Sequence, residues 1–292
     1  MSKTILLPKR VVFSMLGPVI DIGKEFIMNL QDIAKIRKEN PVVVNYSNFV
    51  TPFLVANGLN AIGASPIMSD EVSEAAELVQ LASAVVINAG ASRREGWPLI
   101  EQLCKSANEL KKPLVLDPVA VGATKYRQEL NLMLLEKYHF DVIRGNVGEI
   151  AVLAGIDWQT RGIDAGDGSG DISEVVQACA QKFNNVVIAS GEVDYISDGK
   201  RVTTVHNNTK LLPAIVGSGD LLSSVAGAFS AVADDPFDAA VVASLELSCA
   251  GERAAAKLDH QNLPGSFLNF LLDELANITP EQVEKIMKVG EQ

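Results

Sequence analysis

The residues best suited to chemistry begin at Gly217, where the chain reads Gly217-Ser218-Gly219-Asp220 ahead of a segment rich in alanine and leucine. Two glycines allow a sharp backbone turn that exposes N–H groups, and a helix behind them would direct its positive end into that turn. The motif indicates an anion hole in which Asp220 takes a proton from an attacking hydroxyl. The alternative is a glycine turn in which Asp220 caps the helix. Taken alone, the motif favours this alternative over the anion hole.

Two further motifs follow apolar runs that are typical of buried strands. Asp117 ends one run, and ligands of open α/β sheets gather at the carboxyl ends of strands. Arg144 and Glu149, in the sequence RGNVGE, offer a clamp for phosphate oxygens and a carboxylate for a metal-bound water. The alternatives are a turn residue before proline for Asp117, a surface ion pair for Arg144 and an exposed first-turn glutamate for Glu149.

A fourth motif, Ser190-Gly191, ends the last strand before a predicted hairpin, and its small residues would let a nucleotide approach closely. All four motifs are predicted to lie at the same strand edge, so they would converge on one crevice. Two carboxylates suit Mg²⁺, and phosphoryl transfer requires little beyond positioning and charge neutralisation. The residues therefore predict a Mg-dependent kinase that uses ATP as co-substrate on a small alcohol.

The elements that must position these motifs alternate short β-branched runs with helical patterns from Pro41 onward, which is typical of a mostly parallel sheet covered by helices. Apolar runs predict buried strands at 42–44, 66–68, 84–87, 113–116, 140–143 and 185–189. Two runs that turn at Asp198-Gly199 predict an antiparallel hairpin at one edge. Helices are predicted at 71–82, 97–111, 172–183, 221–233, 237–258 and 267–276, and a long flexible loop at 160–170.

The composition limits the partners that this chain can have. Its 36 acidic and 25 basic residues give a net charge of -11, which argues against nucleic acid and anionic membranes. Three distant cysteines and three isolated histidines show no metal-ligand spacing, so we expect buried free thiols and no transition-metal site. These features predict a soluble, cytoplasmic protein.

Residues 1–27 stand apart from this pattern. Lysines and an arginine precede the apolar stretch 11–20, which loosely imitates a signal peptide. Gly17-Pro18 interrupts the stretch, which is too short to span a bilayer and has no small-x-small cleavage site. We therefore expect residues 1–27 to be an extension outside the fold or a start chosen too early, and residues 28–292 to form one kinase domain.

From about Met28 to Phe270 the sequence resembles the hydroxyethylthiazole kinase family, the thiamin-salvage branch of the ribokinase-like superfamily. The motifs that carry the resemblance are ANGL at 56–59, GASPIM at 63–68, LDPV at 116–119, VGAT at 121–124, RGNVGE at 144–149, GEVD at 191–194 and PGSF at 264–267. The resemblance implies a three-layer ribokinase-like α/β fold and phosphorylation of 4-methyl-5-(2-hydroxyethyl)thiazole by ATP and Mg²⁺. It also implies a homotrimer with active sites at the subunit interfaces.

The same resemblance assigns roles to individual residues. It implies that Met68 and Gly217 contact the alcohol, Arg144 and Ser190 the ATP phosphates, and Asp117 and Glu149 the magnesium network. Gly191 accompanies Ser190 in the nucleotide site. Asn48 is the one residue retained from the family motif His-x-Ile-Thr-Asn, and it is assigned to the alcohol site.

The chain also departs from the family. Members usually carry a cysteine where this chain has Asp220, whereas the wider superfamily carries an aspartate as base. A carboxylate is ionised at neutral pH, while a thiol with a pKa of about 8.5 is mostly protonated. Val44, Phe53 and Val216 replace polar residues near the expected alcohol pocket, and Ser190 replaces a threonine. A kinase for another hydroxyalkyl heterocycle, an NAD(P)H-hydrate dehydratase and a non-catalytic ligand-binding paralogue therefore stay open.

Overall fold

The computed structural model describes residues 11–14, 17–21, 27–90, 92–158, 171–259 and 261–291. The loop predicted at 160–170 lies outside these residues. Three short strands, β1 (Val11–Ser14), β2 (Gly17–Asp21) and β3 (Ile27–Met28), pair antiparallel in a small sheet of their own. The expectation that residues 1–27 are an extension outside the fold or a start chosen too early stays a prediction.

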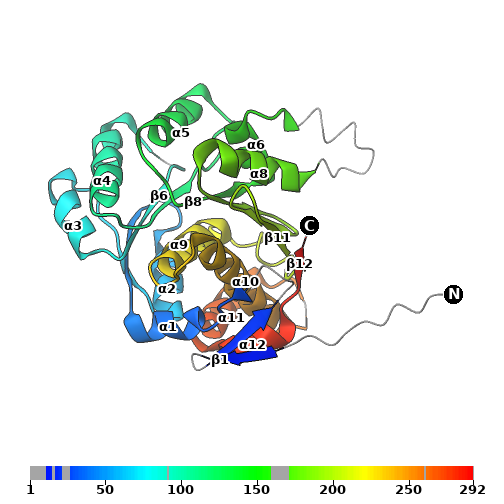
Figure 1. Ribbon diagram of the computed structural model, residues 1–292. Coiled ribbons are helices and arrows are strands. Elements are labelled where there is room, and N and C mark those ends of the chain that lie inside the picture. Colours follow the sequence, from blue (N-terminus) through cyan, green and yellow to red (C-terminus); the bar gives the residue numbers. More distant parts are fainter. Residues whose placement is uncertain are drawn as a thin grey trace.

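A nine-stranded sheet in the order β12-β11-β10-β9-β8-β7-β6-β4-β5 forms the centre of the molecule (Figure 1). Its parallel strands are β4 (Val42–Tyr46), β5 (Ser65–Ile67), β6 (Ala84–Asn88), β7 (Leu114–Asp117), β8 (Val142–Asn146) and β9 (Val186–Ser190). The antiparallel edge consists of β10 (Asp194–Ser197), β11 (Val202–Val205) and β12 (Val289–Glu291). The predicted parallel sheet with an antiparallel edge hairpin is confirmed, and β12 extends that edge by a strand that the sequence did not indicate.

Helices cover both faces of this sheet (Figure 1). One layer contains α1 (Asp32–Glu39), α2 (Pro52–Ile62), α9 (Ser218–Ser230), α10 (Pro236–Ala256), α11 (Pro264–Asn277) and α12 (Pro280–Ile286). The other contains α3 (Ala75–Leu81), α4 (Trp97–Glu109), α5 (Lys125–Lys137), α6 (Val147–Ala154) and α8 (Ile172–Phe183). The three-layer α/β architecture is therefore confirmed.

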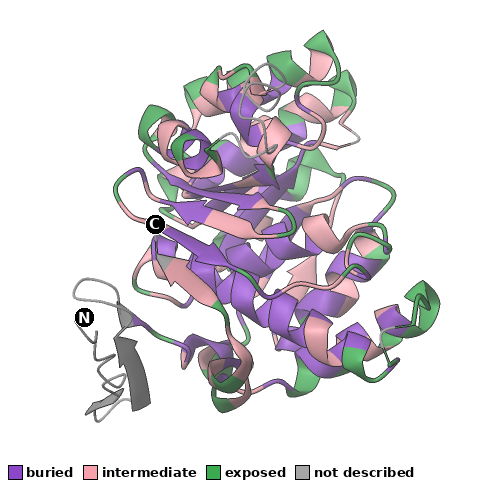
Figure 2. Ribbon diagram, turned by 90° about the vertical axis from the view of Figure 1, so that its right-hand side faces the viewer, coloured by how far each residue is buried: buried purple, intermediate pink, exposed green. Residues whose placement is uncertain are grey.

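Alternate residues of each strand pack against opposite helical layers, as the period of a strand requires. Val43 and Val115 pack on the side of α9 and α10, whereas Val44 and Leu114 pack on the side of α3 and α4. Buried residues accordingly run through the sheet and along the inner faces of the helices (Figure 2). Among the described residues, no helix combines the length and apolar character needed to cross a membrane.

Among the predicted boundaries that differ from the structure, two bear on the site. β8 continues through Arg144 and Gly145, beyond the predicted end of the strand at 143, because these residues pair in register with Ile188 and Ala189 of β9. The helix predicted from Leu221 begins three residues earlier, at Ser218. Ser218, Gly219 and Asp220 therefore form its first turn.

The three cysteines are buried free thiols, as predicted. Burial raises the pKa of Cys179 and of Cys249 to about 12, so neither thiol carries an appreciable charge at neutral pH. These cysteines belong to the core of the fold.

Candidate active site

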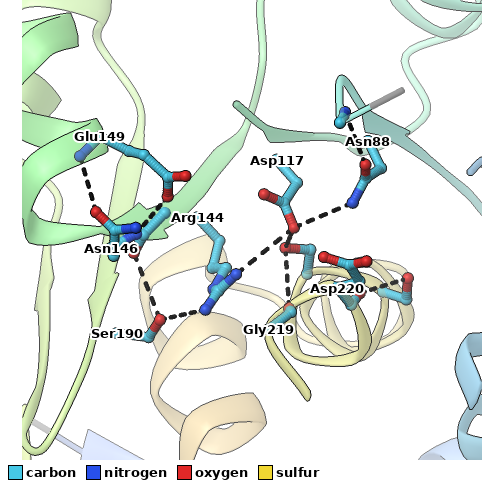
Figure 3. Close-up of polar contacts among 12 residues, drawn as sticks. Asn88, Asp117, Arg144, Asn146, Glu149, Ser190, Gly219 and Asp220 are labelled. Atoms are coloured by element: carbon cyan, nitrogen blue, oxygen red, sulfur yellow. Dashed lines mark hydrogen bonds and ion pairs between the residues drawn. The ribbon is translucent and has the colours of Figure 1, made fainter. Parts of the chain in front are cut away.

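Polar side chains gather where the parallel strands end beside the first turn of α9 (Figure 3). Asn88 ends β6 and lies opposite Asp117 at the end of β7, while Asn146 ends β8 opposite Ser190 of β9. Neighbouring parallel strands present their carboxyl ends at one edge, so this convergence follows from the sheet topology. The structure thus brings together residues from all four motifs.

Gly217 sets the entry into α9. Its φ of +97° is left-handed, and a Cβ there would lie 2.6 Å from Thr51 Cγ2, so both the conformation and the space favour glycine. The Gly217 carbonyl accepts the first helical hydrogen bond, from the Leu221 N–H at 2.8 Å. The first-turn N–H groups of α9 consequently face the crevice as a partially positive helix end.

Asp220 is the third residue of α9 and is held from the side of α2. Its Oδ2 accepts hydrogen bonds from Asn48 Nδ2 at 2.7 Å and from the Thr51 hydroxyl. The helix cap is Gly217, so the alternative in which Asp220 serves as the cap is wrong. These two donors fix the position of the Asp220 carboxylate, the kind of group that can serve as a general base.

Arg144 reaches from β8 between Ser190 and Asp117 (Figure 3). It donates to the Ser190 hydroxyl, and its Nη1 lies 3.6 Å from Asp117 Oδ2. A Cβ on Gly219 would lie 2.6 Å from Arg144 Nη2 and closer still to Nη1, so Arg144 lies directly over the first turn of α9. Its side chain is only 13% exposed, which excludes the alternative of a surface ion pair.

Asp117 is fully buried at the end of β7, so it is no exposed turn residue. Its Oδ2 accepts a hydrogen bond from the Ser223 hydroxyl at 2.7 Å, whereas the buried Oδ1 has no hydrogen-bond partner among the residues that the structure describes. Burial raises its pKa to about 7, the Arg144 charge opposes this shift, and the Asp220 charge adds to it. A buried carboxylate oxygen without a partner fits a position beside Mg²⁺ or one of its waters.

The carboxylate of Glu149 accepts its hydrogen bonds mainly from backbone N–H groups. Its Oε2 accepts from the Asn146 N–H at 2.7 Å, and Asn146 Oδ1 accepts from the Glu149 N–H, which completes a capping box for α6. Its Oε1 accepts from the N–H of Ala120, a residue with a left-handed φ of +55° in the loop after Asp117. Glu149 therefore secures that loop, and it is half-buried rather than the exposed glutamate of the alternative.

A metal at this site would depend on groups other than protein side chains. Within the described ranges, no three His, Cys, Asp or Glu side chains lie close enough together to hold a metal ion. Mg²⁺ commonly keeps several waters and binds through one or two carboxylates plus phosphates. Asp117 fits one such carboxylate, and Glu149 fits only an outer position.

A pocket of about 490 Å³ opens beside these residues. Arg144, Ser190, Gly191, Ser218 and Gly219 line its polar end. A second part of its wall comes from the segment before α9 and from α10: Asn207, Asn208, Thr209, Lys210, Leu212, Pro213, Ser244, Leu247 and Ser248. Sequence reasoning missed this second group, because its residues form no motif and are brought together only by packing.

The predicted alcohol-site residues are more dispersed. Asn48 lies beside Asp220 and donates a hydrogen bond to it. Gly217 also lies close to Asp220, because it caps the helix α9 in whose first turn Asp220 stands. Met68 follows the edge strand β5, packs against the core and is not among the described residues that line the pocket. The structure therefore gathers Asn48 with Asp220 and leaves Met68 apart from the pocket.

The three apolar substitutions fall into two environments. Phe53 and Val216 are more than 70% exposed. Phe53 is the second residue of α2, close to Thr51, which donates to Asp220, and Val216 precedes Gly217 at the start of α9. Val44 instead is buried in the core. The expectation that Val44 alters the polarity of the alcohol pocket is thus corrected, because its strand position turns the side chain into the helical layer of α3 and α4.

Comparison with known proteins agrees with this geometry. The model of the hydroxyethylthiazole kinase family (HK) matches residues 33–281. A hydroxyethylthiazole kinase of Pediococcus pentosaceus is 83% identical over 264 residues, which cover 90% of this chain and all of the relative. The chain belongs to the hydroxyethylthiazole kinase family.

Solved structures place this family member among related folds. The structure of a hydroxyethylthiazole kinase protein from Pyrococcus horikoshii OT3 is 36% identical, with a TM-score of 0.82 over 90% of this chain and 98% of that one. A ribokinase-like superfamily protein from Enterococcus faecalis V583 is 14% identical, with a TM-score of 0.58 over 80% of this chain and 86% of that one. The predicted family and the ribokinase-like fold are both confirmed.

Proposed function

We propose that this chain transfers the γ-phosphoryl group of ATP, with Mg²⁺, to the primary hydroxyl of 4-methyl-5-(2-hydroxyethyl)thiazole in thiamin biosynthesis or salvage. The observation that carries the proposal is the first turn of α9, where Arg144 lies over Gly219 and the next residue, Asp220, presents a carboxylate. A base and a phosphate clamp on one helix end are the groups that phosphoryl transfer to an alcohol requires.

In this proposal Asp220 takes the proton of the alcohol as its oxygen attacks the γ-phosphorus. The bond from the γ-phosphorus to the β–γ bridging oxygen breaks, and the electron pair leaves on ADP. Arg144 and the N–H groups of Ser218 and Gly219 are placed to stabilise the charge on the phosphate oxygens. When bound, Mg²⁺ would supply further neutralisation of that charge, and Asp117 and Glu149 are proposed for its surroundings.

The pocket beside Arg144 is proposed for the nucleotide. Its volume of about 490 Å³ lies within the range of small-molecule sites, and its polar end coincides with Arg144, Ser190 and Gly191. The alcohol would then approach Asp220 from the side of Asn48, Gly217 and Met68. Because the apolar side chains of Phe53 and Val216 are exposed, a related hydroxyalkyl heterocycle is the second candidate for the substrate.

A homotrimer with interfacial active sites is part of the proposal. Phe49, Val50, Phe53 and Val216 are large apolar side chains, each more than 60% exposed, and they flank the segments that hold Asp220. Contact with a second copy would remove this surface from water. Sedimentation velocity should show a single trimeric species, and a monomer of full activity would contradict this part.

The buried free thiols support a reducing, cytoplasmic location.

The test is a phosphorylation screen with Mg-ATP over hydroxyethylthiazole, hydroxymethylpyrimidine and pyridoxal-type alcohols. ADP release that depends on hydroxyethylthiazole, with the phosphorylated thiazole seen by mass spectrometry, is the expected result. Turnover of another alcohol would change the proposed substrate but leave the proposed reaction unchanged. ATP-driven repair of hydrated nicotinamide cofactor would identify a dehydratase, and binding without ADP release would identify a non-catalytic paralogue.

A further inference from the structure

The two carboxylates of the site are joined by two buried asparagines: Asn48, two residues beyond β4, and Asn88, the last residue of β6. Asn88 is 5% exposed, and its amide hydrogen-bonds to Asn48, to Asp117 and to the Gly90 N–H. We propose that Asn88 is a positioning residue that fixes Asp117 and Asp220 relative to each other. This inference rests on the proposed role of Asp220 as base.

Backbone groups fix the orientation of the Asn48 amide. Its Oδ1 accepts from the N–H groups of Val50 at 2.7 Å and Thr51 at 3.1 Å, so the carbonyl end must face the backbone. The amino end consequently points into the site, where Nδ2 donates to Asp220 at 2.7 Å and lies 3.3 Å from Asn88 Oδ1. A flipped Asn48 would place an acceptor against the Asp220 carboxylate, which is unfavourable.

The Asn88 amide is oriented in the same way. Its Oδ1 accepts from the Gly90 N–H at 2.9 Å and faces the amino end of Asn48. Its Nδ2 must then point the opposite way, where it lies 3.4 Å from Asp117 Oδ2. The donors therefore run in a fixed direction, from the backbone through Asn48 and Asn88, and each asparagine turns its N–H groups, not its carbonyl oxygen, toward a carboxylate.

This arrangement matters because Asp117 and Asp220 come from different elements, β7 and α9. No hydrogen bond between them is available while both are ionised, since both are then acceptors only. The two asparagines provide the missing donors. If Asp117 were displaced, the hydrogen bonds that run through Asn88 and Asn48 to Asp220 would resist the movement. Buried hydrogen-bonded networks of this kind hold reacting groups within the narrow tolerance that catalysis requires.

Gly90 offers a way to move the Asn88 amide without removing it. A Cβ at Gly90 would lie 2.8 Å from Asn88 Oδ1, which is closer than real Cβ contacts allow. Gly90 is not among the glycines with left-handed φ, so its backbone accepts alanine. Gly90→Ala therefore displaces the amide, whereas Asn88→Ala deletes it.

The experiment measures steady-state kinetics of Asn88→Ala and Gly90→Ala in the full chain, with thermal unfolding to verify folding. The controls are Asn277→Ala, at an exposed asparagine near the end of α11, and Gly265→Ala, where an added Cβ meets nothing within 4 Å. We expect kcat to fall roughly 10-fold to 100-fold in both Asn88→Ala and Gly90→Ala, as for other residues that orient functional groups. KM for both substrates should change by less than about threefold, because neither variant removes a substrate-binding group.

Folded variants that keep kcat within about twofold of wild type would overturn the proposal, as would a loss confined to KM. Asp220→Asn, measured in parallel, separates this inference from the proposed function. Turnover that is lost in Asp220→Asn but kept in Asn88→Ala and Gly90→Ala refutes the positioning role alone. Turnover that survives in Asp220→Asn refutes the assignment of the base, and the positioning role with it.

Discussion

The close approach of Arg144 to Gly219 gives a sharp prediction for Gly219→Ala. The added Cβ would lie 2.6 Å from Arg144 Nη2, whereas ordinary contacts begin near 3.4 Å. The guanidinium must therefore retreat by about 1 Å, and a misplacement of this size costs about 10²-fold in rate. We expect kcat/KM for ATP to fall by about that factor.

Stability should change little in the same variant. The group that moves is the end of a flexible side chain, and alanine favours the helix over glycine by roughly 0.5–1 kcal/mol. Gly265→Ala is a matched control, since Gly265 is also the second residue of its helix and a Cβ there meets no heavy atom within 4 Å. It should gain the same helix propensity and keep wild-type kinetics.

The assay is a coupled ADP-release measurement under varied Mg-ATP, with urea unfolding for stability. Gly219→Ala with wild-type kcat/KM for ATP would refute the reasoning, because it would mean that the position of Arg144 is irrelevant to the reaction. An equal loss in Gly265→Ala would also refute it, since that loss could not come from Arg144.

Three further predictions concern stability, each measured by urea unfolding. Gly217→Ala should lose roughly 1–3 kcal/mol, because φ is left-handed there and the Cβ would press on Thr51, and an unchanged midpoint would contradict this. Glu149→Gln should lose about 1–3 kcal/mol, since one of its two backbone N–H partners is left without an acceptor, whereas wild-type stability would show that these bonds contribute little. Burial raises the pKa of Glu246 to about 8, with Arg37 opposing, so the folded state holds a proton that the unfolded state releases. The free energy of unfolding should fall from about pH 5 to pH 8 by up to about 1.4 kcal/mol per pH unit. Glu246→Gln should remove this slope and should be more stable than wild type at pH 8, and parallel pH curves would contradict the assignment.

The sequence predicted most of the sheet because its central strands are buried on both faces and read as continuous apolar runs. The prediction of strands failed where pairing between distant parts of the chain decides which residues form a strand. Arg144 and Gly145 are not apolar, yet they extend β8 because β9 offers them partners in register. β12 is three residues long and pairs with β11 from the far end of the chain, and no local pattern marks it.

The candidate site was predictable in its charged members and not in the groups that orient them. A glycine turn, a strand-end carboxylate and an arginine carry recognisable patterns. Asn88 does not, because an asparagine that ends a strand reads as a turn residue. Its partners lie 40 and 29 residues away in the chain, and Asp220 is 172 residues from Asn48, so only the folded sheet reveals that they form one network.

The most direct measurement of the central claim is single-turnover phosphoryl transfer by Asp220→Asn, together with ATP affinity by calorimetry. Asparagine keeps an oxygen for the Asn48 and Thr51 donors but cannot accept a proton from the alcohol. We predict that the rate falls by roughly 10²-fold or more while the affinity for Mg-ATP changes less than about threefold. An undiminished rate would show that the hydroxyl proton goes elsewhere, and Asp220 would then have no part in the chemistry.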